Sequence, residues 1–440
     1  MKTLTGIASV IYLISIYFIS NYCDQSQFSM IFGVYSISFA TFIYLVLQSK
    51  QVSFKFLLGL GILVRVLLIF SFPNLSDDIY RFYWDGILWW SEVHPFDFLP
   101  SELMNLEALP DVRLKEIYPL LNSPEYYTIY PPFCQALFSL SANLGTSIES
   151  SSIILKTFYF LGDMMAVAAL IQLLKRFELP SRLSLLYFLN PMIILELIGN
   201  IHAEVWMVCF LLWMSYFLMD RKYWLAGILY SLAISSKILP LMFGPLILVY
   251  LWKKKEGVGF MVSAALSLIL FFGLMLYGSN VQHLLSSINL YFQSFEFNAS
   301  FYYFFRWLGY LKSGYNQIAF IGPGLAILSL LVILGLSWQL IKNKMDIDRN
   351  LLITIALIFC VFLLGSTTIH PWYLSLPLAF GIFSASWRIP IILWSYLIFL
   401  SYSAYDTIPV QEHIILLWVE YGLVFFTAFL AYRNTRQYSI

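Results

Sequence analysis

Residues 76–86 read Ser-Asp-Asp-Ile-Tyr-Arg-Phe-Tyr-Trp-Asp-Gly, so three carboxylates, one arginine and several aromatic rings stand close together. They follow the apolar segment 56–72 and open the longest stretch of the chain that is not plainly a membrane span. Charge is scarce in this protein, since only 11% of its 440 residues are charged. A cluster of charged side chains at the mouth of an apolar helix is a candidate functional site.

The composition identifies the class of protein. The chain is 60% hydrophobic, and its charged fraction is well below the roughly 25% of soluble domains. Apolar runs long enough to cross a bilayer recur from end to end. We therefore predict an all-α, polytopic transmembrane helical bundle. The net charge of +1 gives no basic footprint for nucleic acid, so we expect membrane lipids as surroundings and no nucleic-acid partner.

The hydropathy pattern predicts about 14 membrane spans, within a range of roughly 12 to 14. We place them at residues 5–20, 28–47, 54–72, 151–174, 183–199, 203–219, 222–236, 238–252, 258–277, 317–341, 350–366, 371–386, 389–404 and 412–431.

We divide the chain into two additional N-terminal spans in residues 1–53 and a core in residues 54–440. The core has two large outer loops, 73–150 and 278–316. In the first loop, residues 87–92 and 103–118 are expected to be short interfacial helices. The segment Tyr130-Pro131-Pro132-Phe133 is expected to form a turn, because two prolines do not fit inside a helix.

The distribution of basic residues predicts the orientation. With the N-terminus inside, every second connection is basic, and 17 of the 25 Lys and Arg residues, Lys344 among them, fall on the inner side. The unusual polar residues then converge on the outer side. We therefore expect a multi-pass integral membrane protein whose site faces outward.

Asp77 and Asp78 are the first candidates for chemistry. A helix that starts at about residue 77 places Asp78, Arg81 and Asp85 on one face, with Ser76 or Asp77 as its N-cap. A partly shielded carboxylate has a raised pKa and can act as a general base. The alternative is a pair of hydrated carboxylates at a helix end.

Other ionisable residues on the predicted outer side are further candidates. Lys237 breaks the positive-inside trend, so it either snorkels to the interface or binds a phosphate. His202, Glu204 and His370 lie where helices are expected to begin, and each has an ordinary packing role as its alternative. Arg306 stands among aromatic residues, where an interfacial anchor is the alternative. Arg65, inside a predicted span, is expected to pair with an acidic residue or a lipid phosphate.

The sequence contains no Gly-x-Gly-x-x-Gly or Gly-x-x-x-x-Gly-Lys-Ser/Thr phosphate loop, and no His-Glu-x-x-His motif. A donor must then be met from the membrane or from the outer side, which favours a lipid-linked donor over a soluble nucleotide sugar. A His/Glu pair can bind a metal, so a divalent metal stays open, but we assign no metal ligand and no cofactor.

Several motifs together resemble the GT-C superfamily of integral-membrane glycosyltransferases, and in particular the bacterial polyprenol-phosphate-mannose-dependent mannosyltransferases. The matching elements are residues 77–86, His94-Pro95-Phe96, 129–133, Asn200-Ile201-His202-Ala203-Glu204, Lys237 with Pro240, and His370-Pro371-Trp372-Tyr373. The likeness covers most of the chain from about residue 56. The superfamily usually places its acidic loop after the first span, whereas here the loop follows the third.

The resemblance implies an inverting transfer of a hexose, with mannose expected, from a polyprenyl-phosphate donor to a glycan, lipid or protein acceptor. It also implies a bacterial cytoplasmic (inner) membrane with the active site on the outer face. Asp78 or Asp77 would be the base, with Asp78 favoured. Lys237, Arg81 and His370 are candidates for the phosphate, and His202 and Glu204 for hydroxyl groups. The remaining candidates for substrate contact are Tyr80, Asp85, Tyr130 and Arg306.

A transporter or flippase for a lipid-linked or polar solute is the alternative function. Such a protein is expected to carry ionisable residues near the midplane of several spans and to show two similar halves. This sequence instead gathers them at one side and shows no evident half-repeat.

Overall fold

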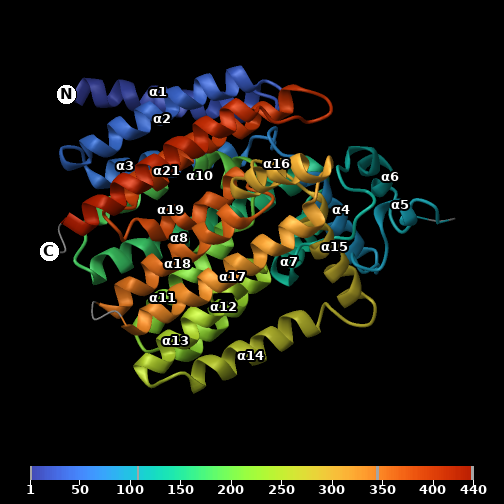
Figure 1. The fold of residues 1–440 in the computed structure, drawn as a ribbon. Helices are drawn as coiled ribbons and strands as arrows, with labels where there is room; N and C mark the ends of the chain where they lie inside the picture. The colour runs from blue at the N-terminus through green and yellow to red at the C-terminus, as the bar shows by residue number, and fades with distance from the viewer. Residues whose placement is uncertain (1, 107–108, 343–345, 438–440) are drawn as a thin grey trace.

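The computed structural model describes residues 2–106, 109–342 and 346–437, and these residues form a helical bundle (Figure 1). They contain no β-strand, only one isolated parallel bridge between Phe297 and Thr368. The predicted fold class, a polytopic all-α bundle, is confirmed.

Among the residues that the structure describes, seven helices are long and apolar enough to cross a membrane. They are α1 (Lys2–Tyr22), α2 (Phe28–Leu47) with η1 (Gln48–Lys50), α8 (Ile148–Arg176), α17 (Ile318–Lys342), α18 (Ile347–Gly365), α20 (Arg388–Leu397) with η7 (Ile398–Asp406), and α21 (Ile414–Gln437).

An eighth candidate is a bent pair of helical segments. η3 (Ser181–Ser184) and α9 (Leu185–Phe188) precede the bend, and α10 (Pro191–Ile193) and the π-helical η4 (Ile194–Gly199) follow it at 56°. The bend has a local cause, because Pro191 lacks an N–H and the Asn190 side chain accepts from the Met192 N–H at 3.0 Å.

The remaining predicted spans are helical but shorter than 18 residues. They are α3 (Phe54–Ile69), α11 (Glu204–Met219), α12 (Tyr223–Ser236), η5 (Leu239–Phe243) with α13 (Gly244–Lys254), α14 (Val258–Gly273), and η6 (Pro371–Leu374) with α19 (Ser375–Gly381). The 14 predicted spans therefore correspond to 14 helical segments. By length and composition, seven or eight of these segments in the described residues are long and apolar enough to cross a membrane.

The N-terminal helices pack into the same core as the rest of the bundle. The Tyr12 hydroxyl of α1 donates to the Leu189 carbonyl at 2.6 Å, and the Tyr35 hydroxyl of α2 donates to the Ser395 carbonyl at 2.6 Å. Both tyrosines are fully buried. No break in packing separates residues 1–53 from the rest of the described bundle. The division of the chain at residue 53 stays a prediction.

The predicted outer loops lie at one end of the bundle, opposite the chain termini (Figure 1). They contain α4 (Asp78–Trp90), α5 (Pro100–Leu103), α6 (Arg113–Ile117), η2 (Tyr118–Leu120), α7 (Pro132–Leu144), α15 (Asn280–Ser294) and α16 (Phe301–Ser313). The orientation across a membrane stays a prediction, and Lys344, one of the residues counted for it, lies outside the described residues.

The expected interfacial helices differ in their bounds. Residues 87–92 are mostly the end of α4, which starts at Asp78. The second expected helix, 103–118, includes residues 107–108, which lie outside the described residues, and its described part holds the end of α5, then α6 and the start of η2. Pro110 lies between α5 and α6 and cannot supply the N–H that a continuous helix needs. The predicted turn at Tyr130-Pro131-Pro132-Phe133 is wrong in part: Pro131 is extended, but Pro132 and Phe133 are the first two residues of α7, where the missing N–H of a proline costs no helical hydrogen bond.

Arg65 has the acidic partner that its position predicted. Its Nε lies 2.5 Å from Asp163 Oδ2 of α8, and both side chains are fully buried. Arg65 also donates to the Gly61 carbonyl at 2.9 Å and stacks 4.0 Å from the centre of the Phe188 ring. The pair joins α3, which leads into the acidic stretch, to the longest helix of the bundle.

Candidate active site

Asp78 is the first residue of α4, as the spacing of Asp78, Arg81 and Asp85 predicted. Its N–H lies 3.4 Å from the Ser76 hydroxyl, and 28% of its side chain remains exposed. Burial raises the pKa of Asp78 to about 6, the Glu204 and Asp77 carboxylates also raise it, and Lys237 lowers it. Burial and Asp24 raise the pKa of Asp77 as well. Asp78 is thus an accessible carboxylate whose proton affinity is tuned toward neutral pH.

His202 faces Asp78. Its Nε2 lies 3.8 Å from Asp78 Oδ2, while its Nδ1 lies 2.8 Å from the Glu196 carbonyl oxygen. Burial lowers the pKa of His202 well below its usual value, so the ring is neutral near pH 7. The hydrogen then belongs on Nδ1, which faces an acceptor, and Nε2 presents a lone pair toward Asp78.

Glu196 holds the His202 ring on the side away from Asp78, through contacts with His202 Nδ1. One carboxylate oxygen accepts from the Tyr402 hydroxyl at 2.8 Å, and the other accepts from the Asn200 amide at 3.1 Å. The second oxygen also lies 3.4 Å from His202 Nδ1. Glu196 is fully buried, so these contacts hold the backbone and side chain that orient His202.

An aromatic stack connects His202 to His370. The Trp372 ring lies 3.6 Å from His202 and 4.4 Å from His370, nearly parallel to both, and Phe297 stacks on the far face of His370 at 4.8 Å. Burial lowers the pKa of His370 to about 3. His370 is thus a neutral ring held between Trp372 and Phe297, and its role toward a phosphate stays a prediction.

Lys237 follows the last residue of α12 and forms an ion pair with Glu204, the first residue of α11. Its ammonium also lies 4.6 Å from the centre of the Tyr373 ring. About a quarter of the Lys237 side chain is exposed, whereas Glu204 is almost fully buried. The structure therefore brings together Asp78, His202, Glu204, Lys237 and His370, five of the predicted residues, from distant parts of the sequence.

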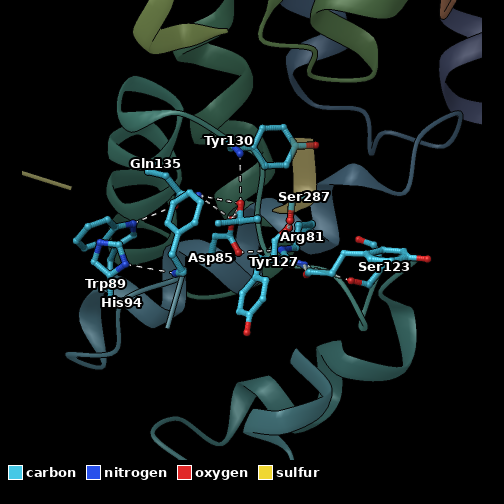
Figure 2. Close-up of polar contacts among 12 residues, drawn as sticks. Arg81, Asp85, Trp89, His94, Ser123, Tyr127, Tyr130, Gln135 and Ser287 are labelled. Atoms are coloured by element: carbon cyan, nitrogen blue, oxygen red, sulfur yellow. Dashed lines mark hydrogen bonds and ion pairs between the residues drawn. The ribbon is translucent and has the colours of Figure 1, made fainter. Parts of the chain in front are cut away.

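Arg81 and Asp85 belong to a buried network beside this cluster (Figure 2). Arg81 Nε donates to Asp85 at 2.9 Å, and Nη1 donates to the carbonyls of Tyr126 and Ser123. Asp85 also accepts from the hydroxyl of Thr128 at 2.5 Å and the amide of Gln135 at 2.8 Å. These contacts hold the loop before α7 against α4. Arg81 is only 4% exposed, so its placement favours a positioning role over direct contact with phosphate.

The remaining residues predicted to contact substrate are Tyr130, Tyr80 and Arg306. Among the described residues, none of these three forms a hydrogen bond, ion pair or ring contact with Asp78, His202 or Lys237. Tyr130 packs edge-on against Phe82, and its N–H lies 3.4 Å from the Thr128 hydroxyl (Figure 2). Tyr80 is half-buried and lies near Phe72. Arg306 belongs to a different cluster, where it pairs with Glu296 and lies 4.3 Å from the centre of the Tyr303 ring.

Sequence reasoning gave no role to several residues that shape the site. The sequence could have indicated Glu196 as a candidate, because it is a carboxylate inside the apolar run 191–199. Trp372 stood in a quoted motif, but nothing local indicated that it lies between two histidines. Asn122, which hydrogen bonds to Asp78, and Thr128 gave no local signal, because loop residues are brought to a site only by the fold.

Within residues 2–106, 109–342 and 346–437, no group of three or more His, Cys, Asp and Glu side chains is arranged to hold a metal ion.

Comparison with known proteins identifies the family. The family model described as alpha-(1->6)-mannopyranosyltransferase, N-terminal domain, matches residues 13–253, which is more than half of the chain. The matched region includes Asp78, His202, Glu204 and Lys237 and ends before His370. No curated protein matches the chain. The chain therefore belongs to the alpha-(1->6)-mannopyranosyltransferase family, and it is a membrane glycosyltransferase that acts on mannose.

Proposed function

We propose that this protein transfers mannose from a β-linked polyprenyl-phosphate mannose to a glycan hydroxyl, with inversion, and forms an α-(1→6) linkage. The reaction takes place on the outer face of a bacterial cytoplasmic membrane, and Asp78 is the general base. The observation that carries this proposal is the setting of Asp78. Its partly exposed carboxylate lies 3.8 Å from the neutral His202 ring and is close enough to the Lys237–Glu204 ion pair for both charges to act on its pKa.

The chemical step uses one base and one leaving group. The acceptor hydroxyl loses its proton to Asp78 while its oxygen forms a bond to the anomeric carbon of mannose. The bond from that carbon to the phosphate oxygen breaks, and the electron pair leaves with the polyprenyl phosphate. Because the attack inverts the anomeric centre, an α-linked product requires a β-linked donor.

His202 supports the base. Once Asp78 is protonated, its O–H can donate to the Nε2 lone pair of His202, the nearest ring nitrogen. A hydrogen bond to the neutral form of a carboxyl raises its pKa. Beside the predicted role of His202 in binding hydroxyl groups, we therefore propose that it positions Asp78 and stabilises its protonated form.

Lys237 is the residue best placed to meet the leaving phosphate. An ammonium acts on phosphate as a point charge and needs no fork geometry. Glu204 holds Lys237 near Asp78 before the donor binds, and the ring of Tyr373 supports its other side. Of the three phosphate candidates, Arg81 is buried against Asp85 and His370 is neutral, whereas Lys237 keeps about a quarter of its side chain exposed.

The donor identity is tested with purified protein in a non-ionic detergent. We expect transfer from polyprenyl-phosphate β-mannose to an α-mannoside acceptor, and no transfer from the α-linked lipid or from a nucleotide-linked mannose. The product linkage is read by NMR spectroscopy. Use of the nucleotide sugar would exclude the lipid-donor proposal, and a β-linked product would exclude the inverting mechanism.

The pH dependence of kcat/KM reports the base in the free enzyme. Asp78 acts only when ionised, and its folded-state pKa is raised to about 6. We expect full activity above that pH and a loss of about tenfold per pH unit below it. Initial rates measured from acid to neutral pH, with donor and acceptor both well below their KM values, check this. An acid limb near 4, the ordinary value of an aspartate, would contradict the proposed environment of Asp78.

A further inference from the structure

A second group of polar residues surrounds a small cavity away from Asp78. The cavity has a volume of about 10 Å³ and lies between the segment before α16, η7 and the start of α21. Its polar lining comes from Asn298, Ser401, Ser403, Glu412, His413 and Glu420. Nothing in the proposed transfer reaction uses these side chains.

Asn298 is held at the cavity by almost all of its polar groups. Its N–H donates to Glu412, its carbonyl accepts from the Tyr421 hydroxyl, and its side-chain amide donates to Glu420 Oε1 at 3.2 Å. Because the NH2 group must face the carboxylate, the amide oxygen is directed elsewhere. That oxygen, Oδ1, is buried and has no hydrogen-bond partner.

Glu420 is fully buried in α21. Its Oε1 accepts from the Trp394 indole at 3.0 Å as well as from Asn298, but its Oε2 has no partner. Two unpartnered oxygens, from an amide and a carboxylate, thus line one cavity, and Glu412 adds a second carboxylate. Buried oxygens without donors are unfavourable, and two adjacent carboxylates repel each other.

A hard cation satisfies all of these groups at once. Carboxylate, amide and hydroxyl oxygens are the ligands of Ca²⁺, which accepts an irregular set of six to eight oxygens and completes it with water. We propose that Glu420 Oε2, Asn298 Oδ1 and the Glu412 carboxylate form a calcium-type cation site, with Ser401 and Ser403 as supporting hydroxyl ligands. The end of the cavity at the exposed His413, next to the partly buried Glu412, is the path by which the ion enters.

The site is next to a contact that reaches the candidate active site. Phe297 precedes Asn298, accepts the Ile369 N–H at 2.8 Å and donates its own N–H to Thr367 at 3.0 Å. The Phe297 ring also stacks on His370. A bound cation would therefore fix the two segments that carry the outer end of the His370–Trp372–His202 stack.

Terbium luminescence tests the site directly, because Tb³⁺ replaces Ca²⁺ and is excited through a nearby indole. Trp394, which touches Glu420, is the built-in sensitiser. With the full-length protein in a non-ionic detergent, we expect a saturable signal on excitation of tryptophan, and Ca²⁺ should compete for it. Glu420→Gln should weaken Tb³⁺ binding by at least about tenfold, and Glu412→Gln should also weaken it. Glu116→Gln, an exposed acid in another loop, is the matched control and should leave binding unchanged.

A thermal measurement provides the independent readout. Ca²⁺ should raise the Tm of the wild type and of Trp394→Phe, in which the luminescence falls, but not that of Glu420→Gln. Glu412→Gln decides the same question if Glu420→Gln does not fold. Equal Tb³⁺ affinity in the wild type and the folded variants, or no effect of Ca²⁺ on the wild-type Tm, would mean that water or a proton fills the cavity and would overturn the proposal. Neither readout depends on mannosyl transfer.

Discussion

Asp78→Asn is expected to lower the rate of mannosyl transfer by about 10²–10⁴-fold, the usual contribution of a positioned general base. Asparagine keeps the size of the side chain but cannot accept the proton of the acceptor hydroxyl. The measurement is kcat with saturating polyprenyl-phosphate mannose and acceptor. The Tm should change little, because the Asp78 side chain is partly exposed and the folded state loses no strong ion pair.

Asp77→Asn is the matched control for this prediction. Asp77 stands at the N-cap position of α4, and its side chain makes no capping hydrogen bond to the helix. Its replacement should leave most of the activity and the acid limb of the pH profile in place. If Asp77→Asn loses transfer and Asp78→Asn retains it, the base is Asp77, and the role that we assign to the Asp78–His202 contact is wrong.

Asp163→Leu is expected to destabilise the folded protein by about 3–5 kcal/mol, because it leaves the Arg65 guanidinium buried without its counter-ion. Both side chains are fully buried, and Asp163 additionally accepts from the Tyr187 hydroxyl at 3.1 Å. Thermal unfolding in detergent, followed by circular dichroism, measures the loss. The effect should be large, because burial prevents water from solvating the remaining charge.

The double variant Arg65→Met/Asp163→Leu distinguishes two causes of destabilisation. One is an unpaired buried charge, and the other is poorer packing of the replaced side chains. A buried pair replaced by apolar residues is often neutral, so the double variant should recover most of the stability. Asp220→Asn is the control, because it removes the acid of an exposed pair with Lys222 and should not change Tm measurably. A Tm of Asp163→Leu equal to that of the wild type would show that Arg65 has another route to solvation.

The sequence predicted correctly those structural features that depend on residues close together in the chain. Asp78, Arg81 and Asp85 are spaced by three and four residues, which is a statement about one helix, and α4 begins where that spacing requires. Two prolines after Tyr130 exclude a helix interior, and α7 starts at the second of them. An arginine in an apolar run requires a counter-charge, although its identity, Asp163, came only from packing.

Span counting was informative only in part. Hydropathy located every apolar segment, and each became helical. It did not determine which segments cross as single long helices, because breaks such as Asn190-Pro191 and Lys237 depend on capping and backbone geometry that average hydropathy does not measure.

The sequence by itself therefore determined three things. They are that the protein is a helical membrane protein, where its helical segments lie, and which polar residues would be costly to expose to lipid. What only the tertiary structure decided is how those residues are used. Arg81 is engaged by Asp85, Lys237 is paired with Glu204, and Trp372 separates His202 from His370. The physical reason is that hydrogen bonds, ion pairs and ring contacts act over a few ångströms, and the decisive ones join residues from different helices, such as Lys237 with Glu204 and Trp372 with His202. No local pattern encodes such distances, and packing of the helices sets them.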